Sequence, residues 1–491
     1  MTNSDKFKGS LHRRHFLQGL GAATILGVGG CAGKDLIVSP YSGQPLQQPL
    51  VETSEDGLLD TKVVSQMCRY TLDGDAVNLR GYNGKPVGNT LDIKGGDTLK
   101  LKLINDMPLL DPIDAVCTID GVMLYTGYDV TNMHLHGLHV SPKAPSDDIF
   151  ISVKPGHSYP YEYEIPKDHP PGTYFYHAHV HGSTAIQVGS GMSGALIIRG
   201  DIDDIPAIKA AKEQVMVMQT QRFDAKGECP DYATLNLGDK TYINGQYLPV
   251  IRMKKGEVQR WRLINASHKV PLNLKMEWYR YTTTMPFTVL CLDGNPLPKT
   301  REVNSLELVP GNRADVLVKG FSPGTYYLTG GVEGGNLATI IVEDEGEDMT
   351  LYSGDLPENP HLKPISAAEV TFGRRLEFGF VYGQSPSFTV NDKVFSCDDP
   401  WQIPLNSVEE WEVYNHTAYP HPFHIHVNPF QVVSGGGIEP GTWLDTMNFP
   451  AYERITFRTR FQKYTGKYVF HCHNLMHEDM GMMQGVEVTE T

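Results

Sequence analysis

Apolar and polar residues alternate along three passages of the chain, which is the pattern of β strands that are buried on one face. The passages run from Gly96 to Asn105, from Lys255 to Asn265 and from Leu405 to Asn415. Each follows a turn-rich segment and precedes a second matching stretch. The turn segments are Arg80–Gly84, Ile243–Gln246 and Val390–Lys393, and the later stretches are Pro171–Tyr176, Pro323–Leu328 and Gly466–Phe470.

These copies lie about 150 residues apart, which predicts one β-sandwich for each copy. We therefore expect an all-β fold of three Greek-key β-sandwich domains, at residues 55–202, 203–368 and 369–491. The segments Asp201–Ala211 and Pro357–His361 support the two boundaries. The 49 glycines and 33 prolines suit short strands joined by turns, and 491 residues are too many for one ordinary core.

The N-terminus is expected to be a targeting segment, residues 1–31, rather than part of the fold. Basic residues precede the apolar stretch Phe16–Gly30, which is too short to span a membrane. The run His12–Gln18 contains two adjacent arginines and resembles a twin-arginine signal, which predicts export to the periplasm or envelope of a bacterium. Val28–Ala32 is open to two interpretations. It is a lipobox, in which Cys31 carries a lipid that attaches the protein to the membrane, or an ordinary small-residue cleavage site.

The formal charge is −15, and the charges are scattered along the chain. Without a basic block, the chain is not expected to bind nucleic acid. Beyond the leader, no stretch is long and apolar enough to span a bilayer. The sequence specifies no oligomeric state.

Seven cysteines are present. One belongs to the leader, and Cys472 lies between two histidines and is predicted to bind a metal. The other five could form at most two disulfides in an oxidising compartment, with one thiol left over and the pairing open. They are Cys68, Cys117, Cys229, Cys291 and Cys397.

Ten of the 19 histidines fall in four short clusters, His134–Gly137, Tyr176–His179, His421–His426 and His471–Met482. The first two clusters belong to the first repeat and the last two to the third. The matching stretch of the second repeat, Tyr327–Gly330, has no histidine. The middle domain is therefore expected to carry no metal ligand and to act as a spacer.

Each cluster contains a His-x-His pair, and alternate residues of a strand point to the same face. Four such pairs supply eight imidazoles, which is too many for one ion and suits a cluster of three. Because the pairs come from the first and third domains, we expect the cluster at the interface between them.

The same alternation predicts a second metal site. Cys472 faces away from the two histidines that flank it, and His421, three residues before the next histidine, faces away from the pair that follows. With His477 and Met482 they give one thiolate, two imidazoles and a thioether, the ligand set of a blue copper site. A lone His-x-His pair is more often a surface or core pair, and zinc is the usual ion of isolated His/Cys sites. Four pairs together with Cys472 favour copper.

These motifs resemble those of the multicopper oxidases, the family of laccases, bilirubin oxidase and bacterial metal oxidases, and the similarity runs from about residue 60 to the C-terminus. It implies cupredoxin-like domains and an enzyme that takes single electrons from a reductant and reduces O2 to water with four copper ions. It also implies which residues hold each ion. Type 1 copper would be held by His421, Cys472, His477 and Met482; type 2 by His134 and His424; and the type 3 pair by His136, His177 and His473 and by His179, His426 and His471.

Members of this family place a carboxylate near the three-copper cluster to deliver protons. Glu478 matches such a position, and the neighbouring pair Asp147 and Asp148 is a second candidate. Glu478 could instead orient a ligating histidine, and the sequence leaves both roles open.

The resemblance places the reductant near the exposed type 1 histidine, expected to be His421. A laccase-like oxidase of phenols or aromatic amines is the first expectation, and a metal (cuprous) oxidase of copper tolerance is the alternative. Cuprous relatives carry Met-rich insertions and Met or Asp before that histidine, whereas this chain has Thr417–Pro420. A non-catalytic copper carrier or scaffold is a third possibility, although non-enzymatic relatives have lost histidines that this chain retains.

Overall fold

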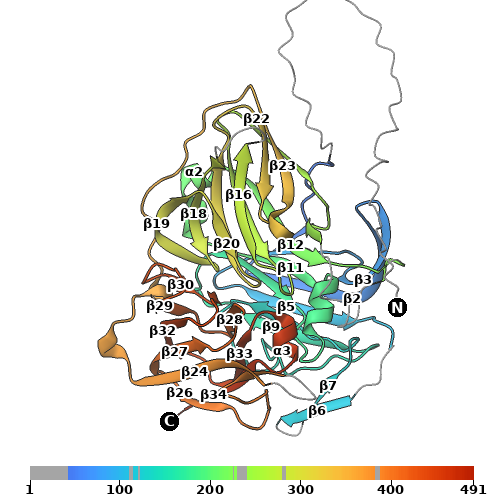
Figure 1. Ribbon diagram of the computed structural model, residues 1–491, viewed down its shortest axis with the longest axis vertical. Coiled ribbons are helices and arrows are strands. Elements are labelled where there is room, and N and C mark those ends of the chain that lie inside the picture. Colours follow the sequence, from blue (N-terminus) through green and yellow to red (C-terminus); the bar gives the residue numbers. More distant parts are fainter. Residues whose placement is uncertain are drawn as a thin grey trace, which may run out of the picture. The chain divides into compact units, whose positions relative to one another are not determined.

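The computed structural model describes residues 43–109, 127–224, 226–228, 240–278, 284–381 and 387–490, and the backbone alone of 114–119 and 122–126. Within these ranges the strands form two sheets in each of three β-sandwiches, together with one hairpin (Figure 1). The predicted all-β fold with three cupredoxin-like domains is confirmed. The predicted targeting segment, including Cys31, lies outside the described residues.

The strands of the three sandwiches fall within residues 51–199, 212–343 and 372–489, and the domain bounds at 203 and 368 stay predictions. In the first sandwich, one sheet has the strand order β1 (Val51–Thr53), β4 (Thr90–Lys94), β11 (Ser193–Arg199), β10 (Gly172–His177), β8 (His134–His136). The other sheet has the order β3 (Asp75–Tyr82), β2 (Leu58–Leu72), β5 (Thr98–Asn105), β9 (Ser158–Glu164). The strands β6 (Asp114–Ile119) and β7 (Val122–Thr126) form the separate hairpin. In the second sandwich, one sheet has the order β13 (Lys240–Ile243), β12 (Lys212–Gln221), β15 (Val258–Asn265), β21 (Arg313–Lys319), β18 (Phe287–Leu292), β19 (Asn295–Val303). The other has the order β14 (Val250–Lys254), β23 (Asn336–Glu343), β22 (Gly324–Thr329), β16 (Leu272–Trp278), β17 (Thr284–Met285), and β20 (Leu306–Leu308) pairs with β16. In the third sandwich, one sheet has the order β25 (Ser387–Val390), β24 (Phe372–Val381), β27 (Val408–Asn415), β32 (Arg454–Arg460), β29 (Phe430–Ser434), β30 (Trp443–Leu444). The other has the order β26 (Trp401–Pro404), β34 (Met483–Thr489), β33 (Gly466–Cys472), β28 (His421–Ile425), β31 (Thr446–Phe449).

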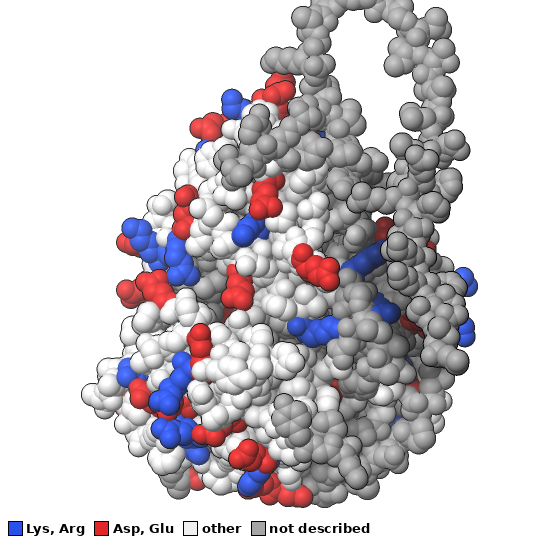
Figure 2. Space-filling view, viewed as in Figure 1, with Lys and Arg blue, Asp and Glu red and all other residues white. Residues whose placement is uncertain are grey.

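Short helices connect the strands. The α-helices are α1 (Thr184–Ser190), α2 (Pro206–Lys209) and α3 (Leu475–Asp479), and the 3-10 helices are η1 (Asp201–Asp204), η2 (Val332–Gly334), η3 (Pro360–Leu362) and η4 (Ala367–Glu369). Within the described ranges, no helix is long and apolar enough to cross a membrane. On the face shown in Figure 2, acidic and basic side chains are interspersed over the described surface.

The threefold repeat of the sequence is a repeat of structure. The three alternating passages form β5, β15 and β27, and these strands pair in parallel with β2, β12 and β24. The second matching stretches form β10, β22 and β33, each antiparallel to the last strand of its sandwich. The three turn segments have positive φ at both central residues, as a tight two-residue hairpin turn requires, at Asn83 and Gly84, Asn244 and Gly245, and Asn391 and Asp392.

Each sandwich has its own apolar core, and the cores of the second and third sandwiches each contain a tryptophan at an equivalent position. Trp261 of β15 and Trp411 of β27 occupy the same position in their passages, and both side chains are fully buried. The cores therefore rest on the inward-facing positions that the alternation predicted.

Free thiols are more numerous than expected. Cys68 and Cys291 are free, and Cys397 is disulfide-bonded. The expectation that one of the five thiols would be left over is wrong, because at least two are free. Cys291 is buried in the core of the second sandwich, away from the surface where a partner could reach it.

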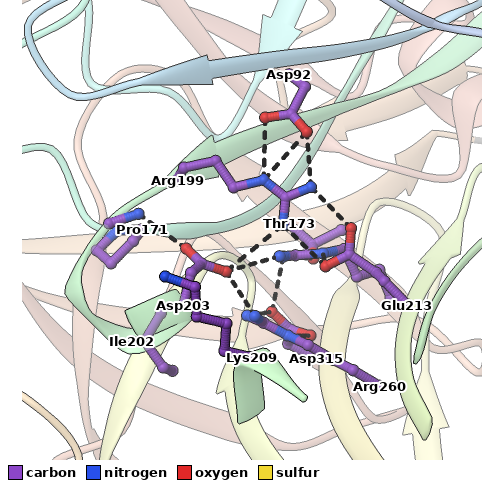
Figure 3. A network of polar contacts seen from close by, with 12 residues as sticks. Asp92, Pro171, Thr173, Arg199, Ile202, Asp203, Lys209, Glu213, Arg260 and Asp315 are labelled. Atoms are coloured by element: carbon purple, nitrogen blue, oxygen red, sulfur yellow. Dashed lines mark hydrogen bonds and ion pairs between the residues drawn. The ribbon is translucent and has the colours of Figure 1, made fainter. Parts of the chain in front are cut away.

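A network of buried charges joins the first sandwich to the second (Figure 3). Arg262 of β15 is fully buried and donates to Glu213 (2.7 Å), to Asp315 (2.9 Å) and to the hydroxyl of Thr173 in β10 (3.1 Å). Asp203 accepts from it as well, at 3.1 Å. A buried charge is stable only when it is paired and hydrogen-bonded, so this network fixes how the two sandwiches meet.

Replacing Arg262 with methionine is expected to destabilise the protein by about 3–5 kcal/mol, because the buried carboxylate of Asp315 loses one of its cations. Replacing Arg252, whose ion pair with Glu343 is largely exposed, is expected to change stability by no more than about 1 kcal/mol. Thermal and denaturant unfolding of both variants measures the difference. Equal effects of the two substitutions would contradict the role given to the buried network.

Candidate metal centres

Four strands bring the His-x-His pairs together. In the first sandwich β10 lies antiparallel to β8, with His177 opposite His134, and in the third β28 lies antiparallel to β33, with His424 opposite His471. The two sets face each other, since the rings of His134 and His426 stack at 4.0 Å between centroids and those of His136 and His424 at 3.8 Å. The expected convergence of the pairs between the first and third sandwiches is observed. Within the described residues, no histidine of the middle sandwich takes part in these groups.

Ring nitrogens of these histidines point at one another rather than at ordinary hydrogen-bond acceptors. His471 Nε2 lies 3.2 Å from Nε2 of His179 and 3.2 Å from Nε2 of His426. His136 Nδ1 lies 3.4 Å from His177 Nε2. Where both nitrogens of such a pair offer lone pairs they repel each other, so this arrangement favours a cation between them.

Five further ring nitrogens of the cluster are buried without any hydrogen-bond partner among the described residues, on His426, on His473 (both nitrogens) and, as the Nε2 atoms considered next, on His134 and His424. On the opposite side of each ring Nδ1 is anchored, to Asp147 Oδ2 at 2.9 Å for His134 and to the carbonyl of Asp445 at 2.9 Å for His424. An imidazole whose outer nitrogen is held and whose inner lone pair is unused is prepared to bind a metal ion.

Burial keeps seven of the eight imidazoles neutral. Loss of hydration is the largest cause in each case and lowers the pKa of seven of the eight, to about 3 for His177 and His179 and well below the usual value for the others, His134, His136, His426, His471 and His473. Neutral imidazole is the form that binds metals, so the donor set fits copper at neutral pH.

A second centre forms on the other side of β33. Cys472 Sγ lies 3.5 Å from His421 Nδ1 and 3.8 Å from His477 Nδ1, and these two nitrogens lie 3.1 Å apart. Met482 is buried in the same core, and its carbonyl accepts from Cys472 N at 3.0 Å. Burial raises the pKa of the Cys472 thiol, so a thiolate there requires a neighbouring cation.

The outer nitrogens of the two histidines in this second centre have polar partners. His421 Nε2 lies 2.7 Å from the hydroxyl of Thr417, and Asn474 Nδ2 lies 3.2 Å from His477 Nε2. The ring of Phe388 stacks on His477 at 3.7 Å. The expectation that His421 is exposed is wrong. Its side chain, at the start of β28, is fully buried because Thr417 covers it. The partly exposed histidine of this centre is His477.

A cleft of about 660 Å³ lies beside this centre. Two of its lining residues, Phe388 and Thr417, touch the two histidines of the centre. The remaining lining residues are Glu377, Gly379, Phe380, Asp392, His416, Ala418, Tyr419 and Tyr452. A small molecule in the cleft is therefore one side chain away from the Cys472 site.

Two of the predicted carboxylates lie at the histidine cluster. Glu478, in α3, is fully buried, with Oε2 2.9 Å from His471 Nδ1 and Oε1 3.5 Å from His179 Nδ1, and burial raises its pKa to about 7. Asp147 contacts His134 and accepts from Leu135 N at 2.9 Å, and burial raises its pKa to about 8.

The third predicted carboxylate, Asp148, is placed differently. It is half-buried, and its Oδ1 accepts from Phe150 N at 3.0 Å. This hydrogen bond stabilises the loop after β8, so Asp148 is the weakest of the three candidates for proton delivery.

Two further residues of the cluster were not predicted, Asp445 and Arg313. Asp445 Oδ1 lies 3.3 Å from His136 Nε2, and Arg313 forms a bidentate ion pair with Asp445 at 2.8 and 2.6 Å. Burial opposes charge on Asp445, but the guanidinium of Arg313 and the imidazole of His424 outweigh it and lower its pKa to about 2. Arg313 belongs to the middle sandwich, so the interpretation of that domain as a spacer is incomplete. The sequence feature that could have indicated this role is the charged Arg313 at the start of a largely buried strand, β21.

Comparison with known proteins gives one consistent family. Three models described as multicopper oxidase match residues 127–202, 211–346 and 369–491. The chain is 28% identical over 435 residues to multicopper oxidase mco of Staphylococcus aureus, with 85% of each chain covered. It is 24% identical over 523 aligned positions to a laccase of Bacillus subtilis, with 93% of this chain and 98% of that one covered. A solved multicopper oxidase from Campylobacter jejuni, described as a metallo-oxidase, superposes with a TM-score of 0.75 at 24% identity and covers 92% of this chain and 96% of its own.

Proposed function

The chain belongs to the multicopper oxidase family and is a copper oxidoreductase that uses O2, and we propose that its reductants are phenols or aromatic amines, as in a laccase. The observation that supports this substrate class is the cleft beside the Cys472 site. Four aromatic side chains line it, Phe380, Phe388, Tyr419 and Tyr452, and the rings of both tyrosines are mostly exposed. Aromatic rings pack favourably on one another in offset or edge-on contacts, so such a cleft suits a planar aromatic reductant.

The proposed enzyme holds four copper ions. His421, Cys472, His477 and Met482 hold the type 1 ion, His134 and His424 the type 2 ion, and the type 3 pair is held by His136, His177 and His473 and by His179, His426 and His471. The inward-facing nitrogens of the cluster and the Cys472 group support this assignment. When bound, copper supplies one-electron oxidation at the first site and four-electron reduction of O2 to water at the cluster.

The protein's own part is to join the two sites and to exclude water. Cys472, the last residue of β33, is covalently bonded to His471 and His473, so an electron that arrives at the sulfur has a short path through the backbone to both histidines. Burial of all these side chains keeps water from the path. No side chain has to move for the transfer.

Proton supply is assigned to Glu478, with Asp147 as the second candidate. Glu478 touches the outer nitrogens of His179 and His471 from inside the protein, and Asp147 touches that of His134. A buried carboxylate beside the place where O2 is reduced can hold a proton there and release it without admitting bulk water. Both side chains also orient the histidines that they touch.

Oxidation of a metal ion is the second candidate function, because the same cleft contains Glu377, Asp392 and His416, with His416 Nε2 3.0 Å from Glu377 Oε2. Carboxylates and imidazole suit a divalent ion such as Fe(II) or Mn(II), whereas Cu(I) prefers sulfur ligands. None of the described lining residues is a methionine. The cleft therefore gives less support to a cuprous oxidase than to the other two substrate classes.

Replacing Tyr419 with alanine separates the two functions. For a phenolic substrate we expect KM to rise about 3–10-fold, since an aromatic contact of roughly 0.5–1.5 kcal/mol is lost, with the blue absorption unchanged. Asp392→Asn is expected to leave phenol oxidation unchanged. Steady-state O2 uptake with a phenol, Fe(II) and Cu(I) makes the comparison. If Tyr419→Ala has no effect on phenol while Asp392→Asn abolishes metal oxidation, the metal oxidase is the correct function.

Residues 1–31 are proposed to direct export of the folded protein to the periplasm or envelope by the twin-arginine route. The adjacent pair Arg13 and Arg14 supports this proposal. Fractionation of cells that express an Arg13→Lys, Arg14→Lys variant tests the route, since that protein is expected to remain in the cytoplasm. The mass of the mature N-terminus decides whether Cys31 carries a lipid.

A further inference from the structure

A buried arginine of the middle sandwich reaches the histidine cluster. Arg313 is the first residue of β21, its side chain is fully buried, and its two terminal nitrogens donate to the two carboxylate oxygens of Asp445 at 2.8 and 2.6 Å. The same guanidinium donates to the carbonyl oxygens of Gly311 (2.9 Å) and Thr173 (3.3 Å). A planar guanidinium held at both ends fixes the plane of the carboxylate that it binds.

Asp445 and the adjacent Thr446 contact one predicted ligand of the type 2 ion and one of the type 3 pair. Asp445 Oδ1 lies 3.3 Å from His136 Nε2 and 3.5 Å from His424 Nδ1. The Thr446 hydroxyl lies 3.1 and 3.0 Å from the same two nitrogens and donates to Asp445 Oδ1 at 2.8 Å. These are the outer nitrogens of the two rings, so the contacts set which way the inner nitrogens point.

The middle sandwich also holds the backbone of this pair. Asp293 Oδ2 accepts from Asp445 N at 3.3 Å and from Thr446 N at 3.1 Å. Asn312, next to Arg313, donates to the carbonyl of Thr446 at 2.9 Å and to Asp293 at 3.0 Å. The side chain and the main chain of the Asp445–Thr446 segment are thus both fixed by the middle sandwich.

The pair is closely packed against two glycines. A Cβ on Gly137, which follows His136 in the first histidine motif and has φ +88°, would lie 2.3 Å from an Arg313 nitrogen and 2.5 Å from Asp445 Oδ2. A Cβ on Gly311, with φ +92°, would lie 3.1 Å from ring carbons of His136 and His473. Glycine at these two positions lets the arginine and the histidines approach closely.

We propose that Arg313 is a positioning residue of the three-copper centre, which acts through Asp445 to orient His136 and His424 and so makes the middle sandwich necessary for binding type 2 copper. The proposal rests on the proposed assignment of copper ligands. It gives the middle sandwich, which has no copper ligand of its own among its described residues, a direct part in the centre. Partners of this kind that orient metal-binding histidines commonly change metal affinity or activity about 10–100-fold when they are removed.

The test compares Arg313→Gln, Asp445→Asn and the double variant with Arg260→Gln as the matched control. Arg260 is also a buried arginine of the middle sandwich, but it pairs with Asp203 and Asp315 and not with Asp445. Four quantities are measured on each holoprotein: total copper, the type 2 signal in electron paramagnetic resonance relative to the blue type 1 absorption, the loss of type 2 copper to a chelator, and the thermal midpoint.

For Arg313→Gln and Asp445→Asn we expect normal type 1 absorption with type 2 copper that is lost about 10–100 times more readily to a chelator. Arg260→Gln should lower the thermal midpoint and keep type 2 copper. The double variant removes the Arg313–Asp445 ion pair from both sides, so its thermal midpoint should rise above that of Arg313→Gln, although Asp293, 3.6 Å from Arg313, still loses its cation. Type 2 copper binding should not recover, which separates positioning from stability.

A wild-type ratio of type 2 to type 1 copper in Arg313→Gln, or an equal loss in Arg260→Gln, overturns the proposal. If Arg313→Gln alone does not fold, the double variant decides, and full retention of type 2 copper in that variant also overturns the proposal. These outcomes are distinct from failure of the proposed function, in which the wild-type holoprotein itself shows no type 1 and type 2 copper.

Discussion

Cys472→Ser is expected to remove the blue colour and O2 consumption together. Among the residues that the structure describes, the sulfur is the only soft anionic donor beside His421 and His477. The backbone leads from this cysteine to both neighbouring histidines of the cluster. A serine hydroxyl does not deprotonate in a buried site and cannot provide the strong charge-transfer absorption of a copper thiolate. Visible spectroscopy and O2 uptake with a phenol measure the two effects on the same sample.

The matched control is Cys291→Ser, which replaces another buried free cysteine, in the core of the middle sandwich. It should retain both the colour and the turnover. The histidine cluster of Cys472→Ser should still bind its three ions, because none of its eight imidazoles is altered. Turnover by Cys472→Ser at the wild-type rate would show that electrons reach the cluster by another route.

Glu478→Gln is expected to lower turnover by about 10²–10⁴-fold without loss of copper. The amide keeps the size of the carboxylate and can still contact His471 and His179, but it cannot release a proton. O2 reduction at the cluster then becomes slow while oxidation of the reductant stays fast. With excess phenol in air, the type 1 site of the variant should therefore remain bleached, whereas the wild-type protein stays blue.

Asp148→Asn serves as the control for this prediction, because Asp148 is half-buried and its oxygen accepts from the loop at Phe150 N. It should keep the wild-type rate. If Glu478→Gln loses type 3 copper in proportion to its activity, the carboxylate acts by orienting His179 and His471. A full rate in Glu478→Gln would leave Asp147 as the proton donor.

The sequence predicted the parts of the fold and the centre that follow from local periodicity. Alternation with period two identified β5, β15 and β27, and the same period sorted Cys472 from the histidines on either side of it. Both arguments need only the residues of one strand. They hold because a strand has one side-chain direction at each position whatever surrounds it.

What the sequence did not predict depends on contacts between distant segments. Arg313 and Asp445 are separated by 132 residues, and neither belongs to a motif that marks a metal site. The sequence interpretation took His421 as the exposed type 1 histidine, but Thr417 covers His421, and His477 stays partly exposed although Phe388 stacks on it. Such covering depends on loops whose paths have no periodic signal.

The number and position of the bound copper ions test the account most directly. Diffraction from crystals of the holoprotein, with anomalous data collected at the copper absorption edge, locates each ion. We expect four ions, three enclosed by the eight imidazoles of the His-x-His pairs and one beside Cys472. A holoprotein with full copper supply that binds fewer ions, or binds them away from these side chains, would contradict the account.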